Sequence, residues 1–297
     1  MTLDIRTLFV CNLFLSLLVA FALFFYKCQR KTYDGYSFWL AGSLMASLGH
    51  LFILSRAVAP LWISIFLTNV AFILSGVLRL DGAYRFMRGE PLRRTFYLLP
   101  AVVGTLTLVF YINYDSISLR NAITSVGILL ICLEIYSDFM SFQPKGGKCI
   151  YRIAAVLNLI FGLAAIARSG LWLARPETGI FDSGNYQGPF LIMVILYEAG
   201  WGFLFLIMNA QRLEVELEGS HIELNATIAR LEKANSEVKV LSGMLPICAA
   251  CKKIRDDRGY WNQIESYIHV HSEASFSHGI CPDCATSLYP ELYPQDE

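Results

Sequence analysis

Seven long apolar segments constrain this chain more than any other feature of its sequence. They cover residues 5–26, 36–57, 61–86, 95–114, 117–140, 150–173 and 189–210. About 20 helical residues are enough to cross a hydrocarbon core of about 30 Å. Backbone polar groups in lipid must bond within their own segment, so these spans must be helices. Hydrophobic residues make up 55% of the chain and charged residues 16%, which excludes an ordinary soluble enzyme and a disordered chain.

Lysine and arginine residues predict the orientation of the spans. Ten of them fall in the first, third and fifth connections, and four fall at the N-terminus and in the even connections. The positive-inside rule therefore places the N-terminus outside and the C-terminus in the cytoplasm. The basic cluster follows the first apolar run, so we expect an uncleaved helix and not a secretory signal. The larger set is Lys27, Arg30, Lys31, Arg85, Arg88, Arg93, Arg94, Lys145, Lys148 and Arg152, and the smaller set is Arg6, Arg56, Arg120 and Arg175.

Polar residues at membrane depth are candidate functional residues, because their burial in lipid is costly. The candidates for sensing an input are His50, Glu134, Asp138, Arg168 and Glu198. Glu134 and Asp138 lie one helical turn apart and share a face of the fifth span. Hydrogen bonding between helices would explain such residues without any ligand. That interpretation applies most to Glu134, Asp138, Arg79 and Asp81, which lie toward the cytoplasmic side.

A seven-residue repeat occupies residues 211–245, directly after the last span. Apolar residues recur at Leu217, Leu224, Leu231, Val238 and Leu245, which is the period of a left-handed coiled coil. If these are d positions, the a positions are Glu214, His221, Ile228, Asn235 and Ser242. Polar a positions cost stability but fix register, so we predict a marginal, parallel, dimeric coil continuous with the last span. A solvated helix that only tethers the tail is the alternative.

Two cysteine pairs form the most specific motif of the chain. Cys248 and Cys251 make one C-x2-C pair, and Cys281 and Cys284 make a second after 29 intervening residues. Two such pairs supply the four thiolates of a closed tetrahedral Zn²⁺ site. A reducing cytoplasm favours a metal over disulfides, while an iron–sulfur cluster or redox-active thiols remain alternatives. We expect His278 beside the ligands and not among them, because four cysteines already complete the site.

The residues around the cysteines predict a small α+β scaffold. A turn at 256–259 separates two short strands, residues 263–271 have helical periodicity, and the second pair opens a helix that ends near residue 288. The expected fold resembles a treble clef or zinc ribbon, and a module this small needs its metal for stability. The chain is therefore predicted to be an all-α membrane protein. It comprises a seven-helix transmembrane sensor domain (1–210), a coiled-coil signalling helix (211–245) and a four-cysteine zinc-binding module (246–297).

Residues 241–257, 259–261 and 277–282 resemble a C-terminal cysteine module found at the ends of many bacterial two-component and sensory proteins. Residues 60–91, with Leu78-Arg79-Leu80-Asp81-Gly82 and Arg85-Phe86, are similar to the seven-helix sensor regions that precede bacterial diguanylate cyclases and histidine kinases. The sequence departs from those families where they are catalytic. It has no GGDEF or GGEEF segment, no phospho-acceptor histidine box and no ATP-binding Gly-rich motif. The resemblance implies a sensory context without an enzymatic activity.

These observations together predict a multi-pass signalling protein of the bacterial inner membrane that is not an enzyme. The bundle would receive an input, a homodimeric helix would relay it, and the zinc-stabilised module would bind an unknown cytoplasmic signalling protein. Exposed aromatic residues are the candidate contacts with that partner, namely Tyr260, Trp261, Tyr289 and Tyr293. Residues 241–297 hold four basic and eight acidic side chains, which argues against nucleic acid as the partner.

Two other functions remain open. The cysteines could themselves be the input of a metal or redox sensor. Alternatively, the bundle could be a membrane enzyme or transporter that uses His50, Glu134, Asp138 and Glu198. This last function predicts one polar cavity that joins all four residues.

Overall fold

The computed structural model of the chain describes residues 4–142, 144, 147–174, 184–242, 245–256, 258–272 and 274–292, without the side chains of 184–186 and 237–242. Lys145, Arg175, Asp257 and Tyr293, which bear on the sequence-based predictions, lie outside these ranges. The chain divides into two compact units, Met1–Leu217 and Glu218–Glu297. Each unit is described by itself below.

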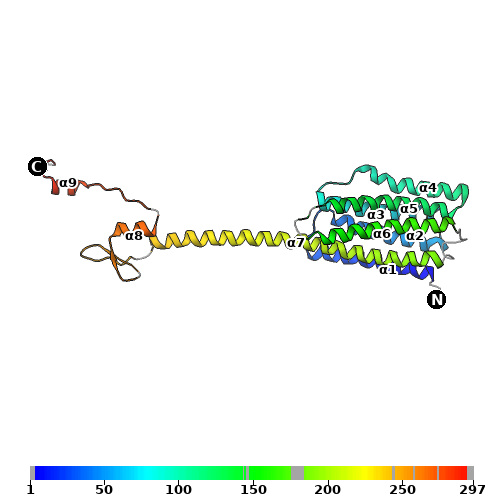
Figure 1. Cartoon of the computed structure of the whole chain (residues 1–297), viewed down its shortest axis with the longest axis horizontal. Helices are drawn as coiled ribbons and strands as arrows, with labels where there is room; N and C mark the ends of the chain where they lie inside the picture. Colours follow the sequence, from blue (N-terminus) through cyan, green and yellow to red (C-terminus); the bar gives the residue numbers. More distant parts are fainter. Residues whose placement is uncertain are drawn as a thin grey trace. The chain divides into compact units, whose positions relative to one another are not determined.

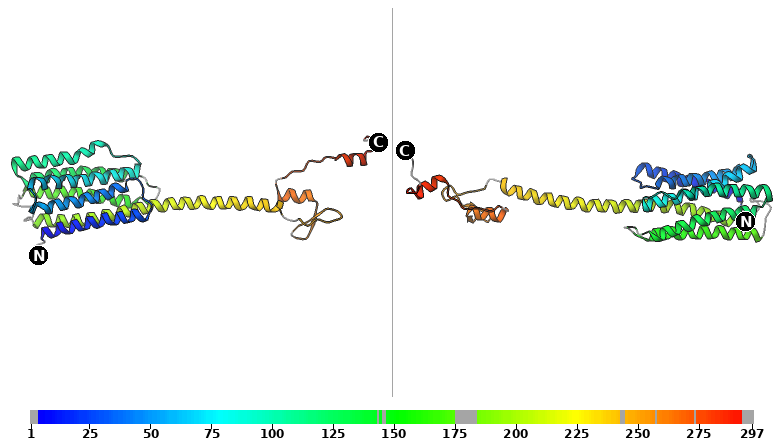
Figure 2. Two further views of the ribbon diagram at one scale, coloured as in Figure 1. Left: turned by 180° about the vertical axis from the view of Figure 1, so that it is seen from behind. Right: turned by 90° about the horizontal axis from the view of Figure 1, so that it is seen from above.

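The first unit is a bundle of helices that run side by side (Figures 1 and 2). Within the described residues, seven helices are long and apolar enough to cross a membrane, so the predicted spans are confirmed. They are α1 (Ile5–Gln29), α2 (Tyr36–Leu54), α3 (Leu61–Arg88), α4 (Leu99–Tyr114), α5 (Ile117–Ser141), α6 (Cys149–Ala174) and α7 (Gly184–Ser242). A 3-10 turn, η1 (Ser55–Ala57), extends α2, and another, η2 (Arg94–Leu98), precedes α4 and forms the fourth span together with it, Arg94–Tyr114. The chain is a multi-pass membrane protein.

The helix ends follow from local sequence signals. The Asp4 carboxylate accepts hydrogen bonds from the backbone N–H groups of Arg6 and Thr7, both at 3.2 Å, and so caps α1. Ser116 caps α5 in the same way, as short polar side chains do at helix N-termini. Gly89 ends α3 in the left-handed conformation, with φ of 72°, a conformation that glycine adopts without strain. These signals explain why the predicted and observed boundaries nearly coincide.

Helix α7 is one continuous helix of 59 residues. Its continuity through the predicted connecting segment is therefore confirmed. It ends at Ser242, so Leu245 lies beyond the helix and the apolar row stops at Val238. Three members of the row, Leu217, Leu224 and Leu231, are each more than half exposed in the single chain.

Aromatic stacking places α7 against three other helices of the bundle. The Trp39 ring of α2 stacks on Phe205 of α7 with ring centroids 3.9 Å apart. Phe161 of α6 stacks on Tyr197 of α7, also at 3.9 Å. Phe139 of α5 meets the α7 residue Trp201 edge-on at 5.9 Å. Such ring pairs add about 0.5–1.5 kcal/mol each beyond their buried area, so α7 is fixed by stacking as well as by general packing.

Two glycines allow α2 and α3 to approach closely at their shared end. Gly35 precedes α2 with φ of +90°, and a Cβ atom there would lie 2.1 Å from the carbonyl oxygen of Gly82. A Cβ atom on Gly82 would lie 2.3 Å from the Trp39 ring. Neither position has room for a side chain, so the sequence must have glycine at both.

The second unit contains a short hairpin and two short helices after the end of α7. Strands β1 (Ile254–Arg255) and β2 (Trp261–Asn262) pair antiparallel, and they are followed by α8 (Ile264–His271) and α9 (Pro282–Leu288). The Asp256 carboxylate closes the hairpin turn, because it accepts from Tyr260 N–H at 2.9 Å and Asn262 Nδ2 at 3.0 Å. The first of these bonds is the main reason that the pKa of Asp256 is lowered. The predicted hairpin and both predicted helices are confirmed as secondary structure.

Gly35→Ala should lower the free energy of unfolding by about 2–4 kcal/mol, since it adds left-handed backbone strain to a backbone clash. Gly170→Ala is the matched control, because Gly170 is an exposed helical glycine and a Cβ atom added to it would meet no neighbour within 4 Å. The control should stay within about 1 kcal/mol of the parent chain. Thermal unfolding of the purified chain in detergent measures both values. Equal midpoints for the two variants would contradict the close approach described above.

Candidate functional site

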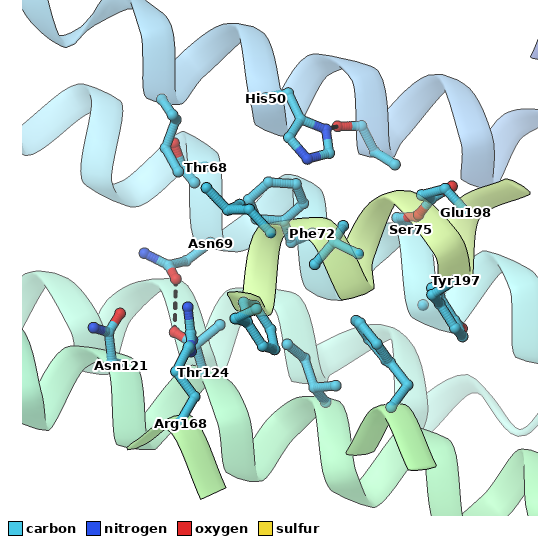
Figure 3. Close-up of a pocket in the computed structure, with 18 of the residues that line it drawn as sticks. His50, Thr68, Asn69, Phe72, Ser75, Asn121, Thr124, Arg168, Tyr197 and Glu198 are labelled. Atoms are coloured by element: carbon cyan, nitrogen blue, oxygen red, sulfur yellow. Dashed lines mark hydrogen bonds between the residues drawn. The ribbon is translucent and has the colours of Figure 1, made fainter. Parts of the chain in front are cut away.

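A cavity of about 160 Å³ lies inside the seven-helix bundle. Figure 3 shows that its labelled side chains come from several helices and face a common space. Its wall combines aromatic and aliphatic side chains with an unusual number of polar ones. The polar and charged lining residues are His50, Arg56, Thr68, Asn69, Ser75, Arg79, Arg120, Asn121, Thr124, Arg168, Gln187, Tyr197 and Glu198. Ligand sites are commonly such apolar cavities with a few convergent polar groups.

A buried ion pair between α3 and α7 forms one part of the wall. Arg79 Nη2 donates to Glu198 Oε2 at 2.6 Å, and the two side chains are only 4% and 6% exposed. The Arg79 guanidinium also lies over the Tyr197 ring, 5.9 Å from its centroid. The Tyr197 hydroxyl donates to Asn158 Oδ1 at 3.1 Å. This polar cluster therefore links α3, α6 and α7 at the depth where lipid surrounds the bundle.

His50 lies in the cavity wall and forms a hydrogen bond to its own helix. Its Nδ1 atom lies 2.8 Å from the Ala46 carbonyl oxygen, a bond that requires a proton on Nδ1 because the carbonyl oxygen can only accept. The ring packs edge-on against Phe72 with centroids 4.9 Å apart. His50 is 2% exposed, so the structure places this predicted residue at the cavity and not at the lipid surface.

Three arginines lie at one end of the cavity. Arg56 is in η1 after α2, Arg120 is in the first turn of α5, and Arg168 is near the end of α6. Successive helices alternate in direction, so these three positions belong to the same end of the bundle. Arg120 Nη1 donates to Asp115 Oδ1 at 3.0 Å, whereas no acidic partner of Arg56 or Arg168 is found among the described residues.

Polar side chains of α3 and α5 lie between the arginines and the ion pair. Thr124 Oγ1 donates to Asn69 Oδ1 at 2.6 Å, the bond drawn as a dashed line in Figure 3. Thr68 is 3% exposed, and its hydroxyl has no hydrogen-bond partner in the described part of the chain. The cavity is thus lined with polar groups along its length, and some of them are unpaired.

Glu134 and Asp138 do not line this cavity. Asp138 forms an ion pair with Arg88, and Glu134 lies half-buried on the same helix face, beside a separate shallow hollow. Asp81 is also structural, because it accepts from Leu92 N–H at 2.9 Å and from the Tyr97 hydroxyl at 2.6 Å. Of the predicted input-sensing residues, the structure brings together His50, Arg168 and Glu198.

Arg56 and Arg120 were not predicted as cavity residues, because the sequence presents them as charges of the outer connections. Thr68, Asn69, Thr124 and Tyr197 were also missed. The sequence of α3 does contain a pattern that points to the cavity. The lining residues from this helix recur every three or four positions, at Ile65, Thr68, Phe72, Ser75 and Arg79. A polar stripe with that period inside an apolar span indicates a wetted or ligand-lined face.

Helix α7 is held at a second place by the connection between α1 and α2. The buried Asn209 accepts from Tyr33 N–H at 3.3 Å and donates to the Lys31 carbonyl oxygen at 3.1 Å. Glu216 contacts both Lys31 and the Tyr33 hydroxyl. Burial raises the pKa of Tyr33 to about 12, so its phenol keeps the proton that it donates. The same helix therefore carries Glu198 in the cavity and a polar contact with the α1–α2 connection.

The cysteine pairs each have a local geometry that fits a metal ligand pair. Cys248 N–H donates to the Lys253 carbonyl oxygen at 2.8 Å, and Lys252 adopts the left-handed conformation with φ of 58°. The N–H groups of Cys251 and Ala250 lower the pKa of the Cys248 thiol. Cys281 occupies the N-cap position of α9, and the N–H of Cys284 lowers its pKa.

The structure does not gather the two pairs into one site. Across the described ranges, which include all eight cysteines, no group of three or more His, Cys, Asp or Glu side chains is placed to hold a metal ion. His278 therefore has no ligand cluster beside it in this structure. Each cysteine pair by itself has the local geometry of two metal ligands. A site made of all four cysteines remains a prediction.

Glu198→Gln should lower the free energy of unfolding by about 3–5 kcal/mol, because it leaves the buried Arg79 charge unpaired. Replacing both partners with methionine should recover most of the loss, since a paired removal leaves no buried charge. Glu134→Gln is the control, because Glu134 has no hydrogen-bond or ion-pair partner in the described part of the chain. Thermal unfolding in detergent measures all four chains. A double variant less stable than Glu198→Gln would contradict the ion pair.

Comparison with known proteins places the chain in no family. No protein-family model matches the chain, and no curated protein or solved structure is detectably similar to it. The resemblance of the tail to cysteine modules of sensory proteins therefore stays a prediction from its motifs. Its function is inferred below from the residues of this chain alone.

Proposed function

We propose that this chain is a membrane signalling receptor whose bundle binds a small ligand and whose α7 relays that event to the tail. One observation carries the proposal. Helix α7 contributes Gln187, Tyr197 and Glu198 to the cavity wall and then continues without a break to Ser242. A ligand in the cavity contacts the same helix that forms the start of the tail. With the predicted orientation, the arginine end of the cavity faces outward from a bacterial inner membrane.

The relay works through a dimeric helix in this proposal. Leu224, Ile228 and Leu231 are 57%, 44% and 64% exposed in the single chain, and their heptad spacing matches the seam of a parallel dimer. The occupant of this face is a second copy of the chain. Because the a positions are mostly polar, the coil is marginal, and a small change in α7 is enough to shift its packing.

The tail in this proposal is a zinc-stabilised interaction module without catalytic activity. Zn²⁺ would be held by Cys248, Cys251, Cys281 and Cys284, and its binding would bring the two preformed pairs together. Metal binding commonly supplies the folding free energy of modules this small. The exposed side chains of Tyr260, Trp261 and Tyr289 support a protein partner. The alternative of an enzyme or transporter is weaker, because Glu134 and Asp138 lie apart from His50 and Glu198.

The relay can be tested by disulfide trapping in native membranes. Leu224→Cys lies on the predicted seam, and Glu223→Cys, one position away, is its matched control. With an oxidation catalyst, the seam variant should form cross-linked dimers well above the parent chain, and the control should not. Adding Glu198→Gln should reduce the seam yield by at least about twofold, because α7 loses its fixed contact with α3. Adding Glu134→Gln should leave the yield unchanged.

Equal yields for the two cysteine positions would contradict the dimeric seam. A seam yield insensitive to Glu198→Gln would contradict the relay. The eight native cysteines are common to every variant, so differences from the parent report the introduced thiol.

The zinc proposal predicts one zinc ion per purified chain by elemental mass spectrometry. Cys248→Ser and Cys284→Ser should each abolish stoichiometric metal, because three thiolates bind Zn²⁺ more weakly than four. Cys149→Ser is the control, as this exposed thiol lies in the bundle. Metal-free chain whose tail thiols oxidise readily would contradict the proposal and favour the redox-sensor alternative.

A further inference from the structure

We propose that the cavity binds a small organic carboxylate, with its anionic group at Arg56, Arg120 and Arg168 and its apolar body against the aromatic wall. This inference names the ligand class of the receptor site proposed above and therefore depends on that function. It is carried by the charge balance of the cavity, by unpaired donors in its wall, and by its size.

The charge balance of the cavity is strongly positive. Its wall contains four arginines and one carboxylate, that of Glu198, and this carboxylate is already paired with Arg79. Arg56, Arg120 and Arg168 line the same cavity, so their like charges are brought together within it. Unpaired charges inside a bundle are costly, so the described part of this cavity is incomplete without a negative group.

The partial pairing of Arg120 does not change this conclusion. Its partner Asp115 lies at the bundle surface with a side chain 78% exposed, where water weakens the interaction. Arg56 and Arg168 have no acidic partner in the described ranges. At least two guanidinium groups therefore remain for an incoming anion.

Hydrogen-bond donors without partners face the same region. The Nε atoms of Arg56 and Arg168 and the Thr68 hydroxyl are buried and unsatisfied among the described residues. A buried donor without a partner destabilises the folded chain until something accepts from it. Arg168 is nevertheless held in place, because its guanidinium lies over the Phe190 ring at 4.1 Å and its Nη1 donates to Gln187 Oε1 at 3.4 Å. A fixed guanidinium with free donors is suited to a planar carboxylate.

The size and wall of the cavity define the rest of the ligand. A cavity of about 150 Å³ holds a benzene ring, so the 160 Å³ found here admits a substituted ring or a short aliphatic chain. Phe72, Ile128, Phe190 and Val194 provide the apolar wall. Glu198 lies 11 residues beyond Gln187 on α7, which is about 16 Å along the helix axis. The carboxylate end and the apolar body can therefore occupy different depths of one cavity.

The test measures thermal unfolding of the full chain in lipid nanodiscs with probes of one size and different charge. Benzoate, benzamide and benzylamine differ mainly in charge, and acetate, butyrate and succinate extend the set of carboxylates. Sodium chloride is matched in every sample. A ligand that binds the folded chain raises its unfolding midpoint with concentration. At least one carboxylate should do so, and benzamide and benzylamine should not exceed the salt control.

Variants place the effect in the cavity. Arg168→Gln and Arg56→Gln should each weaken carboxylate binding at least about tenfold, the factor expected when one charged hydrogen-bonding partner is lost. Arg152→Gln is the control, because Arg152 is an exposed arginine on the same helix, α6, and it should bind as the parent does. Either cavity variant alone decides the question if the other fails to fold.

Several results would overturn the inference. They are the absence of stabilisation by every carboxylate, equal stabilisation by benzamide, or unchanged binding in both cavity variants. The disulfide-trapping chain with Leu224→Cys separates this inference from the proposed function. Carboxylate binding without any change in cross-linking overturns the receptor function and leaves the anion site. A change in cross-linking caused by benzamide supports the receptor and overturns the carboxylate.

Discussion

The fold of the bundle depends on one constraint: charged and polar side chains within the hydrocarbon region must find partners inside the protein. Arg79 and Glu198 satisfy this constraint for each other, although they are 119 positions apart in the chain. Their ion pair fixes α3 against α7 at a depth where water is scarce. The apolar outer faces alone do not determine which helix is a neighbour of which, because lipid is as apolar as leucine. Polar pairing and aromatic stacking supply that specificity.

The two ends of the cavity differ in how far their charged side chains find partners inside the protein. At the inner end the charges of Arg79 and Glu198 balance, and the neighbouring polar groups of Tyr197 and Asn158 are bonded to each other. At the arginine end the charges do not balance among the described residues. Unsatisfied donors occur at both ends, since the Nε atom of Arg79 also has no partner there, so charge is what distinguishes the two ends. A bundle stabilised only by its own polar contacts would have balanced, paired charges along the whole cavity. The uneven distribution is typical of a site whose remaining partner comes from outside the chain.

The helices and the tail elements were predictable from sequence because their signals are local. The lengths of the apolar runs, the capping residues, and Pro60 and Gly89 on either side of α3 determine where helices begin and end. The C-x2-C spacing determines the tight turn that holds each cysteine pair. The site was predictable only in part. His50 and Glu198 are conspicuous inside apolar runs, whereas Arg56 lies near a span end, where a cavity residue and a loop charge have the same sequence appearance. Pairing between residues far apart in the chain, such as Arg79 and Glu198, leaves no periodic pattern in the sequence.

Coupling between the cavity and the tail needs little free energy if the coil is marginal. A ligand shifts an equilibrium only by the difference between its affinities for the two states, and a tenfold difference is about 1.4 kcal/mol. A strong coil with apolar a positions would resist a bias of that size. The polar a row, with Asn235 and His221, keeps the alternative packings closer in free energy. In the proposed relay, the same polar residues that weaken the coil would therefore allow α7 to report a ligand.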